Sequence, residues 1–244
     1  LQKMDKDTNL MVATMRALMT NQAIERAFRQ RDREALAQLG GPLFASLRDH
    51  HRITHLYFSG PDLVNFYRFH SPEEFGDRID RVTTLKAQAR QEPVHGLELG
   101  ALGTLTLRLV MPWRSEGKVL GYLEIGEEIE HLMGELRDGL AVDMLVLLDK
   151  QMVLPEQWQR GQALMKREGN WDRFATHVAL AQTVDQLPAA LDEPTLQKLL
   201  AGRTVKIRES GRSLHLALIP LRDVGRRHIG DLVVIRDITA LEFA

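Results

Sequence analysis

The feature that most constrains this 244-residue chain is an internal repeat, which spans residues 107–132 and residues 215–241. Each copy reads as a strand, a polar turn, a second strand and the start of a helix, with one residue inserted in the second copy. The matched pairs are Pro112 and Pro220, Arg114 and Arg222, Gly117 and Gly225, Gly121 and Gly230, Leu123 and Leu232, Ile129 and Ile238, and Leu132 and Leu241. The shared order favours two related α+β modules; the alternative is a chance similarity of two hairpins.

A long helix is predicted ahead of the first module. Apolar residues recur at spacings of three and four over residues 3–38, and the pattern stops near the Gly-Gly-Pro sequence at 40–42. A shorter helix at 43–51 leads into the first strand. The long helix would measure about 50 Å, which is more than one small module can cover. We therefore expect it to pack along both modules or against a partner helix, and its apolar stripe suggests a homodimer.

The remaining elements alternate as two α+β modules require. Strands are predicted at 52–58, 63–70, 94–99, 104–113 and 119–126, and again at 142–148, 173–183, 203–210, 213–221 and 228–236. Helices are predicted at 71–91, where Ser71, Pro72 and Glu74 resemble a capping box, and at 127–137, 155–167 and 194–200. The expected ranges are 1–51 for the N-terminal helices, 52–126 for the first module, 127–140 for a connector helix and 141–244 for the second module.

Composition excludes several functions. Lys and Arg number 32 against 33 Asp and Glu, so the near-zero net charge argues against a general nucleic-acid binder. The chain has no cysteine, which excludes disulfides, thiolate metal sites and a cysteine nucleophile. His51 and His55 are four residues apart, but the helix is expected to end between them and no carboxylate follows at ligand spacing, so we expect no metal site. No P-loop or hydrolase motif is present, and we expect no cofactor and no catalysis.

Four segments carry a family resemblance. They are Asn65-Phe-Tyr-Arg-Phe-His-Ser-Pro-Glu-Glu-Phe-Gly76, Gly96-Leu-Glu-Leu-Gly100, Leu107-Arg-Leu-Val-Met-Pro112 and Gly121-Tyr-Leu-Glu-Ile-Gly126. Together they resemble the double-Cache sensor region, a pair of PAS-like extracytoplasmic domains found in bacterial two-component kinases, cyclase receptors and chemoreceptors. The resemblance implies an α+β fold with two tandem PAS-like modules, each an antiparallel sheet with flanking helices.

The same resemblance implies a place and a role. The chain would be the periplasmic part of an inner-membrane receptor, with a membrane-spanning helix before residue 1, another after residue 244, and a cytoplasmic output domain. No apolar run in the chain itself approaches the roughly 18 residues of a membrane span. The chain begins with Leu1 in a helical pattern and ends just after a strand, which we interpret as cuts through a longer protein.

Strand alternation places the expected ligand in the first, membrane-distal module. If the hairpin turn centres on Glu116, Arg108 lies opposite Glu124 and Val110 lies opposite Tyr122, so one face of the hairpin mixes a cation, an anion and an aromatic ring. A bulge would change this pairing. The equivalent strands of the second module are more apolar, and only His215 could contact a polar ligand from mid-strand. Because buried charges are costly unless they are paired, a ligand explains why the first module keeps them.

The candidate ligand-binding residues are Tyr57, Phe66, Arg68, His70, Glu98, Arg108, Trp113, Tyr122 and Glu124. An arginine could hold a carboxylate through two hydrogen bonds, a glutamate could hold an ammonium group, and the aromatic rings could line the site. The ligand would then be a carboxylate, an amino acid or an amine. The structural alternatives are a cross-strand ion pair between Arg108 and Glu124, a solvated Arg68, a structural His70 and a turn carboxylate at Glu98.

These patterns predict a non-catalytic sensor that binds a small molecule and passes a conformational change to its output domain. One alternative is a sensor whose first pocket is vestigial, with dimerisation or a partner protein supplying the input. Another is a cytosolic, cofactor-binding PAS-like protein.

Overall fold

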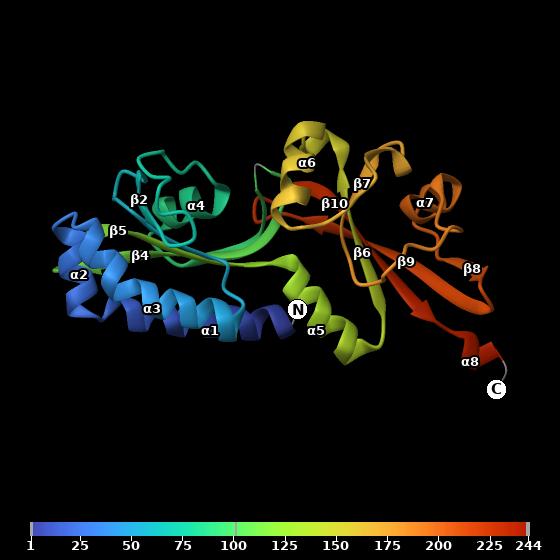
Figure 1. The fold of residues 1–244 in the computed structure, drawn as a ribbon, viewed down its shortest axis with the longest axis horizontal. Helices are drawn as coiled ribbons and strands as arrows, with labels where there is room; N and C mark the ends of the chain where they lie inside the picture. Colours follow the sequence, from blue (N-terminus) through green and yellow to red (C-terminus); the bar gives the residue numbers. More distant parts are fainter. Residues whose placement is uncertain (1, 101, 243–244) are drawn as a thin grey trace. The chain divides into compact units, whose positions relative to one another are not determined.

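In the computed structural model, which describes residues 2–100 and 102–242, N-terminal helices are followed by two five-stranded antiparallel sheets (Figure 1). Contacts divide the chain into two compact units, residues 1–98 with 106–128, and residues 99–105 with 129–244. The predicted α+β fold class is confirmed. The outer ends of the expected ranges, residues 1 and 244, lie outside the described residues.

The helical region predicted as one long helix is divided into three. They are α1 (Gln2–Met19), α2 (Gln22–Arg29) and α3 (Arg33–His51). The Asn21 side chain accepts hydrogen bonds from backbone N–H groups in the first turn of α2, and the Asp32 side chain accepts one from the first turn of α3. Each break between helices therefore contains the N-cap residue of the next helix. The apolar spacing runs through both breaks because each of the three helices buries part of its apolar face. The predicted stop at Gly40–Pro42 is wrong, since these residues lie inside α3.

The first sheet has the strand order β2-β1-β5-β4-β3. Its strands are β1 (His55–Ser59), β2 (Asn65–Arg68), β3 (Val94–Leu99), β4 (Leu105–Ser115) and β5 (Lys118–Glu128). Helix α2 packs on one face through Phe28, whose ring contacts Phe58 and Trp113, and α4 (Val82–Arg90) covers the other face (Figure 1).

The helix predicted over 71–91 is shorter than expected and begins only at Val82. The Ser71 hydroxyl bonds the Glu73 side chain rather than capping a helix. Side chains of β2 hold the segment in an irregular path, because Asn65 and Arg68 both donate hydrogen bonds to the carbonyl oxygen of Glu74. A capping sequence is therefore outweighed here by tertiary contacts.

The second sheet repeats the same topology with the order β7-β6-β10-β9-β8. Its elements are α5 (Ile129–Leu140), β6 (Asp143–Asp149), α6 (Pro155–Leu164), β7 (His177–Gln182), α7 (Glu193–Leu200), β8 (Val205–Glu209), β9 (Arg212–Arg222), β10 (His228–Asp237) and α8 (Thr239–Glu242), with single 3₁₀ turns at Lys150–Met152 and Trp171–Arg173. Residues of α7, β6, β9 and β10 form its apolar core.

The repeated glycines have the same structural task in both sheets. A Cβ atom on Gly121 would lie 2.2 Å from the carbonyl oxygen of Ser59 in β1, and one on Gly230 would lie 2.0 Å from that of Leu147 in β6. Each glycine therefore lets the central strand approach its neighbour closely, next to a bulge in the hairpin. The repeat in the sequence thus reflects a shared backbone geometry.

We expect Gly230→Ala to destabilise the second module by about 1–3 kcal/mol, because the new methyl group would push on rigid backbone. The control is Gly139→Ala in α5, where a Cβ meets nothing within 4 Å, and a gain of about 0.4–1 kcal/mol is expected. Urea unfolding of both variants measures the difference. An unchanged unfolding midpoint for Gly230→Ala would contradict the packing role.

Candidate ligand-binding site

A buried ion-pair network lies on the α4 face of the first sheet. Glu124, in the central strand β5, is 3% exposed. Nη2 of Arg81 donates to both of its carboxylate oxygens, at 2.8 and 2.7 Å, and Nη1 of Arg108 donates to Oε1. Burial raises the pKa of Glu124, but the two guanidinium groups lower it more, so its pKa lies below the ordinary value. The carboxylate is therefore ionised at neutral pH.

The expected register between Arg108 and Glu124 is wrong by two residues. Arg108 pairs with Gly126, and Val110 pairs with Glu124. The turn lies at residues 116 and 117, and a bulge at Trp113 and Arg114 adds a further residue. Because the total shift is even, Arg108 and Glu124 still share a face and meet diagonally.

Tyr57 links the network to the edge strand. It pairs with Glu124 on one side and with Arg68 on the other. The guanidinium carbons of Arg68 and Arg81 lie 5.4 and 4.8 Å from the centre of its ring. The negative ring face stabilises both cations where water is scarce. Arg68 is itself buried rather than solvated, and its Nη2 bonds Asp77 at 2.6 Å.

Glu98 is also buried, at the end of β3, and its task is structural. It accepts hydrogen bonds from the backbone N–H groups of Val82 and Thr83, at 2.6 and 3.4 Å, and from the Thr83 hydroxyl. A carboxylate at this position stabilises the start of α4 both as an acceptor and through the helix dipole. Glu98 therefore fixes the start of α4, directly after Arg81.

Two further candidates lie at the edges of the network. The Tyr122 hydroxyl accepts a hydrogen bond of 2.9 Å from Gln91, which follows the last turn of α4. His70 is exposed two residues beyond β2, with its ring centre 4.9 Å from that of Tyr57 and 4.6 Å from that of His55.

Phe66 and Trp113 lie on the opposite face of the sheet. Both contact Phe28 of α2, with ring centres 5.6 and 5.5 Å away, and the Trp113 ring is stacked at 2°. The expectation that Phe66, Arg68 and His70 share one strand face is wrong at Phe66, because a bulge between β1 and β2 turns this residue toward the helices. The structure therefore brings together seven of the nine candidates.

Sequence reasoning missed Arg81 and Thr84, whose hydroxyl lies 3.5 Å from Glu124. Both lie within the helix predicted over residues 71–91, which begins only at Val82. The predicted helix gave no indication that the Arg81 side chain would face the sheet. The available signal was the run Asp77-Arg-Ile-Asp-Arg81, whose charges are hard to explain on a buried helix face.

The network has more donors than acceptors. Two guanidinium groups offer ten N–H donors, while one carboxylate offers about four acceptor positions. The Nε atoms of Arg81 and Arg108 are buried and have no hydrogen-bond partner among the described residues. Unpaired buried donors are costly, so this face favours an additional acceptor.

The second module has aliphatic residues where the first has charges. The repeat aligns Arg108 with Leu216 and Glu124 with Val233, and both aliphatic residues belong to the second module's core. The expected contrast therefore holds at these two positions. The expectation that only His215 of the second module could contact a polar ligand from mid-strand is wrong, because Asp231 in β10 is a buried carboxylate.

A cavity of about 490 Å³ lies elsewhere in the first module, beside α3 and β2. It is lined by Ala37, Gly41, Phe44, Ala45, Arg48, Thr54, Tyr67, Phe69 and His70. It shares only His70 with the candidate set, and neither Arg81 nor Glu124 lines it.

The fold is a tandem pair of α+β modules with the same strand order. The sequence matches the family model described as the double sensory domain of two-component sensor kinases over residues 5–241. The chain therefore belongs to this family, and the double-Cache resemblance is confirmed. The family comprises sensory domains rather than catalytic ones.

Several solved structures are similar to this chain at low sequence identity. The periplasmic domain of Vibrio cholerae LuxQ is 14% identical, with 96% of this chain and 94% of that chain covered and a TM-score of 0.53. The sensor domain of E. coli DcuS is 19% identical, with coverage of 57% and 100% and a TM-score of 0.49. The ligand-binding domain of the amino acid chemoreceptor PctC from Pseudomonas aeruginosa PAO1, in complex with GABA, is 15% identical, with coverage of 96% and 91% and a TM-score of 0.42.

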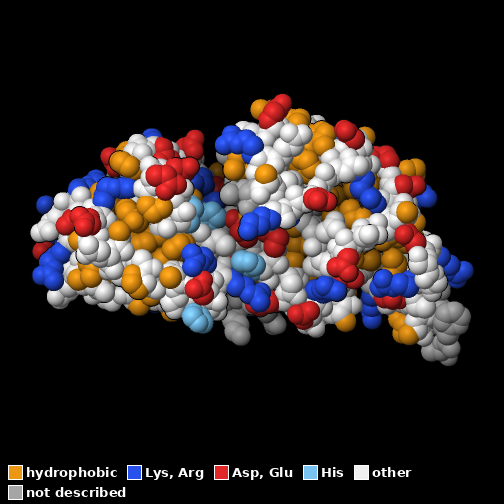
Figure 2. All heavy atoms as spheres, viewed as in Figure 1, with side chains coloured by type: hydrophobic (Ala, Val, Ile, Leu, Met, Phe, Trp, Pro, Cys, Tyr) orange, Lys and Arg blue, Asp and Glu red, His pale blue; other side chains and the backbone are white. Residues whose placement is uncertain are grey.

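No curated protein matches the sequence. Within residues 2–100 and 102–242, no helix has both the length and the apolar character needed to span a bilayer. Basic and acidic side chains are interspersed over the face shown in Figure 2, as the near-zero net charge leads one to expect.

Proposed function

We propose that the chain is the extracytoplasmic ligand-sensing domain of a transmembrane bacterial receptor, and that its first, membrane-distal module binds a small carboxylate. The observation that carries this proposal is the excess of buried arginine donors around Glu124, with the Nε atoms of Arg81 and Arg108 lacking an acceptor. A carboxylate supplies two acceptor oxygens, and its charge strengthens the hydrogen bonds that it accepts from guanidinium groups.

The same arrangement argues against an amine as the group held by Glu124. Its oxygens already accept three arginine hydrogen bonds, two from Arg81 and one from Arg108, and a fourth from the Thr84 hydroxyl at 3.5 Å. An ammonium group would have to displace a guanidinium and would leave that cation buried without a partner. An amino acid would therefore bind through its carboxylate.

The proposed contacts divide by role. Arg81 and Arg108 hold the carboxylate, and Tyr57 and Tyr122 flank it. Arg68 and His70 approach from β2, and Glu98 positions the start of α4. Phe66 and Trp113 support the sheet from its other face.

Sensing requires a ligand with different affinities for two arrangements of the protein. The segment 69–81 joins β2 to Arg81 and is held by the ion pair between Arg68 and Asp77. We propose that this segment moves when the ligand enters, and that the N-terminal helices pass the change to a cytoplasmic output domain. Homodimerisation through these helices stays a prediction; their exposed leucines are Leu10, Leu39 and Leu43.

A thermal-shift panel tests the proposal with acetate, succinate and L-glutamate against acetamide and succinamide, the uncharged amides of the first two. A ligand that binds the folded state raises the melting temperature (Tm). We expect at least one carboxylate to raise the Tm and its amide to have no effect. Arg81→Gln should abolish this increment, while Arg90→Gln, an exposed arginine on the same helix, should keep it.

Two outcomes would contradict the proposal. One is that no carboxylate raises the Tm, which would favour a sensor driven by a partner protein. The other is a full increment in Arg81→Gln, which would move the site away from this network, with the cavity beside α3 as the next place to examine.

A further inference from the structure

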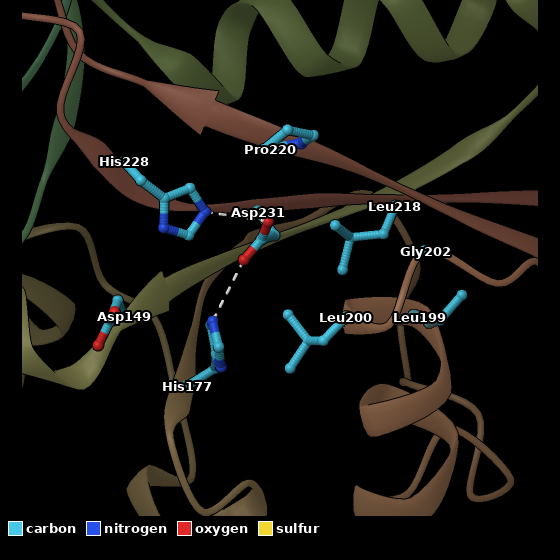
Figure 3. A pocket seen from close by; sticks show the side chains of 9 residues that line it. All are labelled: Asp149, His177, Leu199, Leu200, Gly202, Leu218, Pro220, His228 and Asp231. Carbon is cyan, nitrogen blue, oxygen red and sulfur yellow. Dashed lines mark hydrogen bonds and ion pairs between the residues drawn. The ribbon is translucent and has the colours of Figure 1, made fainter.

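The second module contains a cavity of about 410 Å³ between its sheet and α7. It is lined by Asp149, His177, Leu199, Leu200, Gly202, Leu218, Pro220, His228 and Asp231 (Figure 3). All of these residues belong to one compact unit of the chain. The cavity therefore does not depend on how the two units are placed.

The repeat explains why a space exists here. Pro112 pairs with Tyr122 in the first sheet, and the matching Pro220 pairs with Asp231 in the second. Asp231 thus occupies the position of a buried tyrosine. Replacing a large ring by a short carboxylate leaves room above the sheet, and the second module keeps that room open as a cavity.

Two histidines hold the Asp231 carboxylate at the cavity wall. Nε2 of His177 lies 3.2 Å from Oδ2, and Nε2 of His228 lies 3.1 Å from Oδ1, as Figure 3 shows. Asp231 is only 2% exposed. Burial raises its pKa, but the hydrogen bonds from the two imidazoles lower it more, so the net shift is downward. The cavity wall carries a buried, ionised carboxylate at neutral pH.

The rest of the lining combines negative charge with apolar surface. Asp149 adds a second carboxylate, and neither lysine nor arginine is among the lining residues described. The neighbouring Lys150 is engaged elsewhere, because its ammonium donates to the carbonyl of Phe174 at 2.7 Å. Leucines from α7 and β9 form the wall facing Asp231 (Figure 3).

We propose that this cavity is a second ligand site, which takes a small organic ammonium ion with a short apolar chain. The ammonium group faces Asp231, where each carboxylate oxygen keeps an acceptor position beyond its histidine contact. The chain lies against Leu200 and Leu218, where burial of apolar surface contributes affinity. This site prefers a cation, whereas the site proposed in the first module prefers an anion. The second-module proposal does not depend on the first-module proposal.

The test uses n-butylamine, with n-butanol and butyrate as probes of matched chain length. Two-dimensional ¹H–¹⁵N NMR on the whole chain records which amides shift on titration. We expect n-butylamine to bind in the millimolar range, as suits so small a molecule, with shifts confined to the cavity lining. The alcohol and the carboxylate should cause no such shifts.

Two variants remove the site in different ways. Asp231→Asn removes the charge at nearly constant shape and should weaken binding at least about tenfold. Asp231→Tyr restores the residue found in the first module and should fill the cavity and abolish binding. Asp185→Asn, at an exposed position in the same module, should bind as the original chain does.

The wild-type titration decides the question even if a variant folds poorly. Absence of n-butylamine shifts at the cavity overturns the proposal, and so does equal binding of n-butanol, which would indicate an apolar cavity without charge selection. Retained affinity in a folded Asp231→Asn protein would do the same. A failure of the carboxylate panel leaves this result untouched, because the two sites share no residue.

Discussion

A Glu124→Ala variant is expected to lose about 3–5 kcal/mol of unfolding free energy. The substitution removes the shared counter-charge of Arg81 and Arg108 and leaves two cations on a face that excludes water. Arg108, which is 3% exposed, has no route to solvent without disturbing the sheet. Urea unfolding followed by circular dichroism measures the loss, which should fall on the first module.

The control is Glu116→Ala in the turn between β4 and β5. The Glu116 side chain is 83% exposed, and its ion pair with Arg29 at 3.6 Å is of the kind that contributes little. We expect a change below about 0.5 kcal/mol. A similar loss of unfolding free energy in both variants would show that the buried network stabilises the fold no more than an exposed ion pair does.

The same comparison has a pH dependence with a defined sign. Because the folded-state pKa of Glu124 is lowered, its contribution is complete above the ordinary glutamate value of 4.5 and is lost as the pH falls through the folded pKa. The difference in unfolding free energy between the original chain and Glu124→Ala should therefore shrink below about pH 4.5. A constant difference down to pH 3 would contradict the assignment of the charge.

Trp113→Ala is expected to cost about 3–5 kcal/mol through loss of burial and creation of a cavity. The ring is stacked on Phe28 and meets Phe58 edge-on, with centres 5.5 and 6.0 Å away. It therefore joins α2 to the sheet. Thermal or urea unfolding measures the loss, and the N-terminal helices should loosen together with the first sheet.

Phe75→Ala serves as the matched control for this prediction. Phe75 is an aromatic residue of the same module that is 57% exposed, with the Arg33 guanidinium 3.7 Å from its ring centre. Loss of such a surface contact costs no more than about 1 kcal/mol. If Trp113→Ala instead leaves stability unchanged and abolishes ligand binding, the residue contacts ligand directly and the packing role is wrong.

Much of the sheet structure could be predicted from the sequence. Strand β3 has the predicted bounds, and β6 is displaced by one residue. Alternation of apolar side chains and the repeated hairpin specify strands well, because one face of each strand must meet the core. The polar face of the first sheet could also be predicted, because its mid-strand charged residues align with aliphatic residues in the second copy of the repeat.

The rest depends on contacts between residues far apart in the sequence. Neither the helix breaks at Asn21 and Asp32 nor the late start of α4 disturbs the apolar spacing, so periodicity alone could not reveal them. The register error arose from the position of the turn and from one bulge, and Arg81 was missed because its partner lies 43 residues away. Local patterns specify which elements form, while long-range pairing decides which side chains meet.

Helix α4 is fastened to the first sheet at three places. Glu98 of β3 holds its first turn, Glu124 of β5 holds Arg81 just before it, and Tyr122 holds Gln91 at its far end. Hydrogen bonds at both ends of α4 oppose sliding of the helix along the sheet. We therefore expect α4 and the sheet to move together, while the segment that precedes Arg81 rearranges.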